Sequence, residues 1–190
     1  MNLFFFGGSF DPPHRAHLEI IQYCCKLSDK LLLIPAANSP LKNKPPVAEG
    51  FHRIKMLKLM IQDLDSPIEI EDWEINQSGP SYTYDTIQHL QENYPDSNFS
   101  MVMGADQLMK FNRWKNYEGI MHSVQILGFN RDSCDFTPPN EMNITWLKDF
   151  KVDISSSIIR EKIAKGHSSD NDLPPSIHRY IQNNKLYDYQ

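Results

Sequence analysis

The chain has 190 residues, 40% of them hydrophobic and 23% charged, a composition typical of a soluble globular protein. The length is most simply that of a single domain spanning residues 1–190. The net charge of −5 argues against a broad nucleic-acid-binding face, although a small nucleotide needs only a local cationic pocket. No apolar run is long enough to cross a bilayer, so we expect neither a nucleic-acid nor a membrane partner.

Cysteine usage and the start of the chain point to the same compartment. The three cysteines show no zinc-type spacing, which favours a reducing environment and predicts no protein-bound metal. The apolar run at residues 3–6 ends after four residues and lacks the basic stretch of a signal peptide. We therefore expect a cytoplasmic protein.

The first elements alternate between strand and helix. Residues 3–6 predict a short buried strand, residues 14–27 carry apolar side chains at helical spacing, and residues 30–34 predict a second buried strand that ends at Pro35. Strand, helix and strand in this order favour a parallel sheet.

The rest of the chain continues this alternation. Residues 35–50 predict a long loop, and long ordered loops are often functional. Further strands are expected at residues 68–70, 99–103, 124–129 and 144–147, and further helices at residues 51–62, 83–93, 156–164 and from 174 onward. The predicted class is a doubly wound α/β domain, whose ligands lie beyond the carboxyl ends of the strands. One crevice would then be surrounded by residues 7–17, 35–42, 104–106 and 153–160.

The stretch GGSFDPPHRAHL at residues 7–18 carries the strongest functional signal. Two glycines allow a tight turn after the first strand, Asp11 is a candidate N-cap, and Pro12 suits the first helical position. His14 and His17 would then lie three residues apart near the positive end of the helix. This combination predicts a binding site for phosphate groups.

A second stretch, DISSSIIR at residues 153–160, predicts another helix start. Ser155 or Ser156 would cap that helix, and Arg160 would reach the same anion from one turn further on. The chain lacks a P-loop, a Gly-x-Gly-x-x-Gly turn and a Gly-x-Ser-x-Gly elbow. Two helix starts, two histidines and an arginine without a nucleophile favour phosphoryl or nucleotidyl transfer, which depends on positioning and charge stabilisation.

With these residues the chain resembles the nucleotidylyltransferase superfamily and, within it, the bacterial nicotinate-nucleotide adenylyltransferases. The motifs that carry the resemblance are residues 7–18, 79–86, 103–106 followed by Trp114, 154–160, and the ending at 180–187. The resemblance covers about residues 3 to 188. It implies a Rossmann-like fold with a small C-terminal helical part, and adenylyl transfer from ATP to nicotinate mononucleotide in NAD biosynthesis.

The resemblance also implies a role for particular residues. The catalytic residues would be His14, His17, Lys42 and Arg160. ATP would be bound by Gly7, Gly8, Ser9, Phe10, His14, His17, Gly104, Asp106, Ile154, Ser155, Ser156 and Arg160. The mononucleotide would be bound by Ser9, Lys42, Tyr82, Thr83 and Trp114. Mg²⁺ would accompany ATP, with no metal ligand assigned to the protein, and a homo-oligomer is left open.

Two positions depart from the family pattern and keep alternatives open. Ala16 stands where a glycine is usual between the two histidines, and Leu41 replaces a histidine of the Pro-Pro-His-Lys loop. The alternatives are the same chemistry on nicotinamide mononucleotide or another phosphate acceptor, a nucleotide-binding module without catalysis, and a metal-binding protein that uses the two histidines. Trp114 and Asp106 also suit plain structural roles, and for Arg53 we expect a solvated one.

Overall fold

The computed structural model describes residues 1–41, 44–129, 142, 144–147 and 154–189. Six parallel strands form one sheet in the order β3-β2-β1-β4-β5-β6. They are β1 (Asn2–Gly8), β2 (Lys30–Pro35), β3 (Ile68–Ile70), β4 (Asn98–Gly104), β5 (Gln125–Phe129) and β6 (Ile144–Leu147). The strand order reverses between β1 and β4, which is the position where doubly wound sheets bind their ligands. The predicted class is confirmed.

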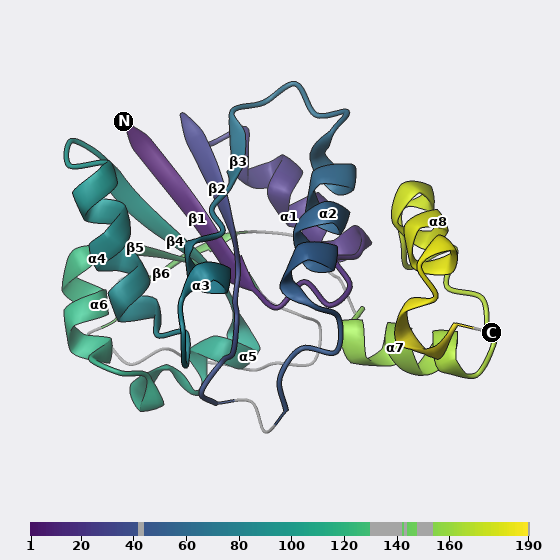
Figure 1. Ribbon diagram of the computed structural model, residues 1–190. Helices are drawn as coiled ribbons and strands as arrows, with labels where there is room; N and C mark the ends of the chain where they lie inside the picture. The colour runs from purple at the N-terminus through teal and green to yellow at the C-terminus, as the bar shows by residue number, and fades with distance from the viewer. Residues whose placement is uncertain (42–43, 130–141, 143, 148–153, 190) are drawn as a thin grey trace.

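The helices cover both faces of the sheet (Figure 1). They are α1 (Arg15–Cys24), α2 (Gly50–Ile61), α3 (Trp73–Asn76), α4 (Thr83–Asn93), α5 (Ala105–Leu108), α6 (Tyr117–Ser123), α7 (Ser156–Ala164) and α8 (Pro175–Asn183), with 3₁₀ turns η1 (Phe111–Arg113) and η2 (Leu186–Asp188). The predicted helices at residues 83–93 and 156–164 have the predicted bounds. The sequence patterns missed the short helices α3, α5 and α6.

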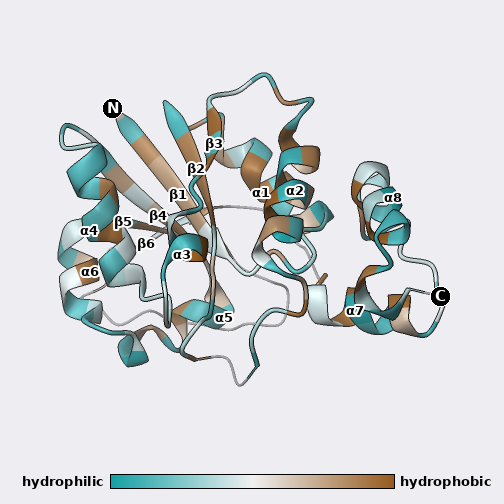
Figure 2. Ribbon diagram, in the orientation of Figure 1, coloured by the Kyte–Doolittle hydropathy of each residue, from teal (hydrophilic) through white to brown (hydrophobic). Residues whose placement is uncertain are grey.

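Strand β1 shows how the sheet divides the core in two. Leu3 and Phe5 point to the face covered by α4 and α6, whereas Phe4 and Phe6 point to the face covered by α1 and α2. All four side chains are buried, because β1 lies in the middle of the sheet with helices on either side. The hydrophobic colouring of the central strands in Figure 2 reflects this double burial.

The C-terminal helices α7 and α8 lie beside the main body, next to α1 and α2 (Figure 1). Ile177 and Ile181 of α8 are fully buried in the same core cluster as Met56 and Leu57 of α2. The end of the chain therefore packs on the side of the sheet that carries α1. Among the described residues, no helix is long and apolar enough to span a bilayer.

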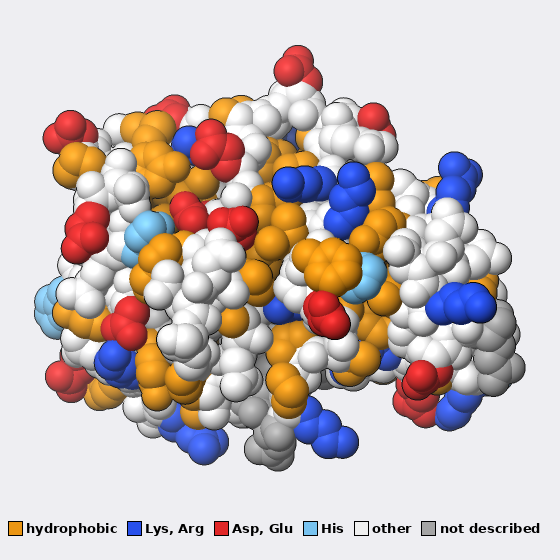
Figure 3. All heavy atoms as spheres, in the orientation of Figure 1, with side chains coloured by type: hydrophobic (Ala, Val, Ile, Leu, Met, Phe, Trp, Pro, Cys, Tyr) orange, Lys and Arg blue, Asp and Glu red, His pale blue; other side chains and the backbone are white. Residues whose placement is uncertain are grey.

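Helix α2 has one exposed and one buried face, and the exposed face belongs to an apolar area of the surface. In Figure 3 acidic and basic side chains are interspersed over the face shown, and apolar side chains gather over α2 and the segment before it. Val47 and Phe51 are 63% and 58% exposed there. The buried face of α2 consists of Arg53, Met56, Leu57 and Met60. Arg53 is only 3% exposed, so the prediction of a solvated role for it was wrong.

Candidate active site

The two predicted histidines lie at the start of α1, beyond the carboxyl end of β1. His14 is the N-cap residue and is buried, whereas His17 is partly exposed one turn into the helix. Their rings stack with centroids 3.8 Å apart. The backbone N–H of His14 donates to Nδ1 of His17 at 3.2 Å. Because Nδ1 accepts this bond, the imidazole of His17 is neutral and its Nε2 carries the proton. His17 is therefore set to donate a hydrogen bond from Nε2.

The turn before α1 differs from the prediction in two ways. Gly7 and Gly8 still belong to β1, and the left-handed conformation falls on Phe10, with a φ of 47°. A side chain at residue 8 would meet the Phe10 ring at 3.1 Å, whereas one at residue 7 would meet no atom within 4 Å. The glycine at residue 8 thus makes room for the Phe10 ring, which packs edge-on against His17 at 5.0 Å between centroids.

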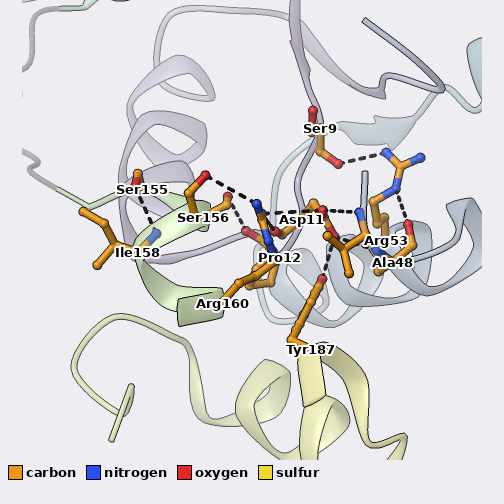
Figure 4. A network of polar contacts seen from close by, with 12 residues as sticks. Ser9, Asp11, Pro12, Ala48, Arg53, Ser155, Ser156, Ile158, Arg160 and Tyr187 are labelled. Atoms are coloured by element: carbon orange, nitrogen blue, oxygen red, sulfur yellow. Dashed lines mark hydrogen bonds and ion pairs between the residues drawn. The ribbon is translucent and has the colours of Figure 1, made fainter. Parts of the chain in front are cut away.

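Asp11 is not the helix N-cap that the sequence suggested. Its side chain is 4% exposed, and its carboxylate accepts hydrogen bonds from Val47 N at 2.7 Å, Ala48 N at 3.0 Å and Tyr187 Oη at 2.9 Å. These donors come from distant segments and hold the carboxylate away from α1. The helix therefore begins at Arg15, within one residue of the start predicted from the apolar spacing, and not at Pro12 as the capping pattern suggested. Asp11 instead joins the first motif to the segment before α2 and to the end of the chain (Figure 4).

Arg53 is a second buried residue that, like Asp11, bonds to several separate segments. Its Nη1 donates to the carbonyl oxygens of Ser9 at 2.8 Å and Ala36 at 2.7 Å, and its Nε donates to that of Ala48 at 3.1 Å. Burial lowers the pKa of the guanidinium, and the charge of Asp11 acts in the opposite direction. One side chain thereby fixes the chain after β1, the chain after β2 and the entry to α2.

The second predicted motif docks directly on the first. The Ser155 hydroxyl accepts from Ile158 N and caps α7, as predicted. The Ser156 hydroxyl donates to the Pro12 carbonyl at 2.9 Å, and Arg160 Nη1 donates to the Asp11 carbonyl at 2.6 Å, with the Asp11 Oδ2 atom 3.5 Å away. The starts of α1 and α7 therefore meet, although they lie about 140 residues apart in the sequence.

Gly104, Asp106 and Ile154, which are also predicted to bind ATP, lie on β4, at the start of α5 and just before α7. Gly104 ends β4, which is the neighbour of β1 in the sheet. A side chain at residue 104 would clash with Oδ1 of Asp106, so the glycine makes room for that carboxylate. Ile154, partly buried, packs against the core cluster on the α1 side of the sheet. Ala16, one of the two departures, is 3% exposed, so its methyl group faces the protein interior.

Two of the residues predicted to bind the mononucleotide, Tyr82 and Thr83, form the start of α4, whereas Ser9 follows β1. Ser81 binds the chain after β2, because its hydroxyl accepts from Ala37 N at 3.0 Å and its N–H donates to Asn38 O at 2.9 Å. Next to it, Lys115 lies over the Tyr82 ring at 4.6 Å and forms an ion pair with Asp85 at 2.9 Å. This ion pair joins the start of α4, where Thr83 is the first residue, to the chain that carries Trp114.

Trp114 packs against the core through its ring and leaves its indole N–H without a partner among the described residues. Its ring packs against Phe111, with centroids 5.4 Å apart, at the edge of the core cluster around α4. Its indole N–H is buried and has no hydrogen-bond partner among the residues that the structure describes. Lys42, predicted as a catalytic residue of the loop after β2, lies outside the described residues, and Leu41 is 38% exposed.

The sequence missed Asp11, Arg53 and Tyr187 as members of this site. A signal existed for Arg53, which shares the helical spacing of Met56, Leu57 and Met60 and therefore lies on the buried face of α2. No local pattern could place Tyr187 next to Asp11, because the two residues are 176 positions apart.

A six-stranded parallel sheet with two helix starts meeting near its switch point is the architecture of a doubly wound α/β protein with an anion-binding crevice. The family model described as cytidylyltransferase-like matches residues 5–162. The chain is 33% identical to a probable nicotinate-nucleotide adenylyltransferase of Chlorobium phaeobacteroides, over 98% of this chain and 100% of that protein. It is 32% identical to the nicotinate-nucleotide adenylyltransferase of Bacillus subtilis, over 96% of both.

Solved structures show the same fold. A Plasmodium falciparum nicotinic acid mononucleotide adenylyltransferase, complexed with NaAD, superimposes with a TM-score of 0.84 at 22% identity, covering 100% of this chain and 98% of that one. The chain belongs to the nicotinate-nucleotide adenylyltransferases of the cytidylyltransferase-like family. The resemblance found in the motifs is confirmed.

Proposed function

We propose that this protein transfers the adenylyl group of ATP to nicotinate mononucleotide, forming nicotinate adenine dinucleotide and pyrophosphate. The observation that carries this proposal is the docking of α7 on the His14–His17 turn, through the Ser156 hydroxyl on Pro12 and the Arg160 guanidinium on Asp11. It brings two helix starts together, an arrangement that supports one anion site, in a chain that matches adenylyltransferases along its whole length.

In this site the two histidines take different roles. His14 is 1% exposed, so it supports the ring of His17 by stacking and fixes its Nδ1 through the backbone N–H. His17 is the imidazole that faces the triphosphate and stabilises the charge that develops at the α-phosphorus. Arg160, Ser156 and the free N–H groups at the start of α7 bind the β- and γ-phosphates.

The reaction needs no covalent enzyme intermediate. A phosphate oxygen of the mononucleotide attacks the α-phosphorus in line, the new P–O bond forms, and the bond to the β-phosphate oxygen breaks as pyrophosphate leaves. We propose that Mg²⁺ enters with ATP, held by phosphate oxygens, because the neutral imidazole of His17 and the single charge of Arg160 leave most of the triphosphate charge uncompensated. Among the described residues, no group of three His, Cys, Asp or Glu side chains could hold a metal ion.

On the acceptor side, we propose that backbone N–H groups near Tyr82 and Thr83 bind the pyridine carboxylate and that Trp114 stacks on the ring. The buried indole N–H of Trp114 supports a ligand there. Ser9 and Lys42 would meet the mononucleotide phosphate. We also propose a cytoplasmic location, supported by the free thiols of Cys24 and Cys25.

Pyrophosphate release tests this function and the choice of acceptor together. The full chain is mixed with ATP, Mg²⁺ and either nicotinate or nicotinamide mononucleotide. We expect faster release with nicotinate mononucleotide, and a rate lower by about 10²- to 10³-fold in His17→Ala, which removes one donor to the transition state. The matched control is His122→Ala, a histidine of α6 that bonds to the Glu118 carbonyl and should keep full activity. Absence of acceptor-dependent release in the wild type refutes the proposal.

A further inference from the structure

The last turn of the chain folds back onto the first motif. Tyr187 of η2 is 6% exposed, and its hydroxyl donates to Oδ1 of Asp11 at 2.9 Å. Lys185, Tyr187 and Asp188 all have φ values between 50° and 62°, the left-handed region that side chains other than glycine rarely adopt. Such residues persist only where the surroundings hold them in place, so the turn is shaped to deliver this phenol to Asp11.

The phenol acts as a fixed donor. Burial raises the pKa of Tyr187, and the nearby charge of Asp11 raises it further, so the hydroxyl stays protonated. The carboxylate that accepts this hydrogen bond also accepts from Val47 N and Ala48 N. Three donors from two segments thus hold Asp11 in one orientation. Figure 4 shows Ala48 and Tyr187 on either side of this carboxylate.

The same Asp11 sets the position of Arg160. Nη1 of Arg160 donates to the Asp11 carbonyl at 2.6 Å and lies 3.5 Å from Oδ2 of Asp11. Arg160 is the guanidinium to which the proposed function assigns the β- and γ-phosphates. Tyr187 therefore stands two contacts away from the triphosphate, through Asp11 and then Arg160.

We infer that Tyr187 is a positioning residue for the triphosphate: by fixing Asp11 it aligns Arg160 and the chain at residues 47–48 for ATP binding. This inference rests on the proposed function, because it needs Arg160 to bind the nucleotide. It assigns the end of the chain a role in nucleotide affinity, in addition to its packing against α2. A purely structural role would instead affect stability and leave the affinities for the two substrates in the same ratio.

The effect of the Tyr187 hydrogen bond can be measured separately from the packing of the C-terminal segment. The segment is also anchored by Ile177 and Ile181 in the core, and by the Ser176 hydroxyl, which donates to Leu59 O. Tyr187→Phe keeps the buried ring and removes only the hydroxyl, so we expect the variant to keep the fold. Tyr180→Phe is a matched control in the same segment, because its hydroxyl bonds to Nδ1 of His52 at 2.9 Å and contacts neither Asp11 nor Arg160 in the structure.

The first measurement is ATP affinity by calorimetry on the full chain, together with KM for each substrate. Tyr187→Phe is expected to weaken ATP binding about fivefold, while KM for the mononucleotide changes less than about twofold. Tyr180→Phe should change neither by more than about twofold. An unchanged ATP affinity in Tyr187→Phe, or equal losses for both substrates, overturns the inference.

The second measurement tests whether the effect passes through Arg160. In an Arg160→Ala background, Tyr187→Phe should weaken ATP binding no further, because the side chain that it positions is gone. Additive losses overturn the inference. Binding of ATP alone needs no acceptor, so a wild type that binds ATP but does not use nicotinate mononucleotide refutes the proposed function and leaves this test intact. A wild type that binds no ATP overturns both.

Discussion

The two halves of the candidate site are built in different ways. The triphosphate half is held by buried contacts between distant segments, with the side chains of Asp11 and Arg160 4% and 27% exposed. The acceptor half is held by an ion pair near the surface, since the side chains of Lys115 and Asp85 are 48% and 37% exposed. Burial strengthens polar contacts and makes each unpaired group costly, whereas water screens an exposed pair.

This difference predicts how each half tolerates change. Around Asp11 the hydrogen bonds form one network, so the phosphate-binding groups are preorganised and one substitution affects several segments. Around Lys115 a lost contact is replaced by water at little cost. We expect the triphosphate half to determine both stability and nucleotide affinity, and the acceptor half to adjust to its ligand.

The largest effect is expected from Asp11→Ala. It leaves the N–H groups of residues 47 and 48, the Tyr187 hydroxyl and two guanidinium groups without their buried carboxylate. Removing one partner of a buried charged network typically costs about 3–5 kcal/mol of unfolding free energy. Denaturant unfolding followed by circular dichroism measures this loss. A loss below about 1 kcal/mol would show that the network is not a structural unit.

A smaller effect is expected from Asp85→Asn in the acceptor half. The exposed ion pair with Lys115 should contribute no more than about 1 kcal/mol to stability. Because this ion pair joins the start of α4 to the chain carrying Trp114, KM for the mononucleotide should rise about two- to threefold with KM for ATP unchanged. Glu161→Gln is the control, since it breaks a still more exposed pair with Lys165 at the end of α7. If Asp85→Asn destabilised the protein as much as Asp11→Ala, the two halves would not differ.

The sequence predicted the parts of the fold and site that depend on neighbours in the chain. The continuous apolar run of β1, the helical spacing in α4 and the serine cap of α7 are local features, and each appears as predicted. The N-cap role predicted for Asp11 was wrong because its carboxylate bonds to residues 36, 37 and 176 positions away. A capping preference describes only the nearest backbone groups, so a stronger distant set of donors overrides it.

The site shows the same limit. His14, His17, Ser156 and Arg160 were found because helix starts are recognisable in sequence, and the structure brings them together. Arg53 was misjudged because charged residues are usually solvated, and only three carbonyl acceptors from separate segments explain its burial. Roles that depend on long-range hydrogen bonds therefore become visible only in the folded chain.

The smallest effect is expected at Glu74, which lies between Thr86 of the acceptor half and Arg53 of the triphosphate half. Its response to pH tests whether the contact between the two halves resembles the buried or the exposed half. Its Oε1 accepts from the Thr86 hydroxyl of α4 at 2.6 Å, and the side chain is also near the charge of Arg53. Burial raises the pKa of Glu74 above its ordinary value, and the bond from Thr86 lowers it only in part. The folded state therefore holds the proton more tightly than the unfolded state, and stability is lost as the pH rises through the raised pKa.

Glu74→Gln cannot ionise, so it removes the loss of stability at higher pH while keeping an oxygen that accepts the hydrogen bond of Thr86. The difference in Tm between Glu74→Gln and the wild type should therefore become more positive as the pH rises from about 4.5, near the ordinary pKa of the group, to 8. Thermal unfolding over a series of buffers measures it, with Glu92→Gln on the exposed side of α4 as the control. A difference that stays flat or falls with pH would mean that Arg53 and Thr86 fully compensate the buried charge. The contacts of Glu74 would then compensate its buried charge as fully as the contacts of Asp11 do in the triphosphate half.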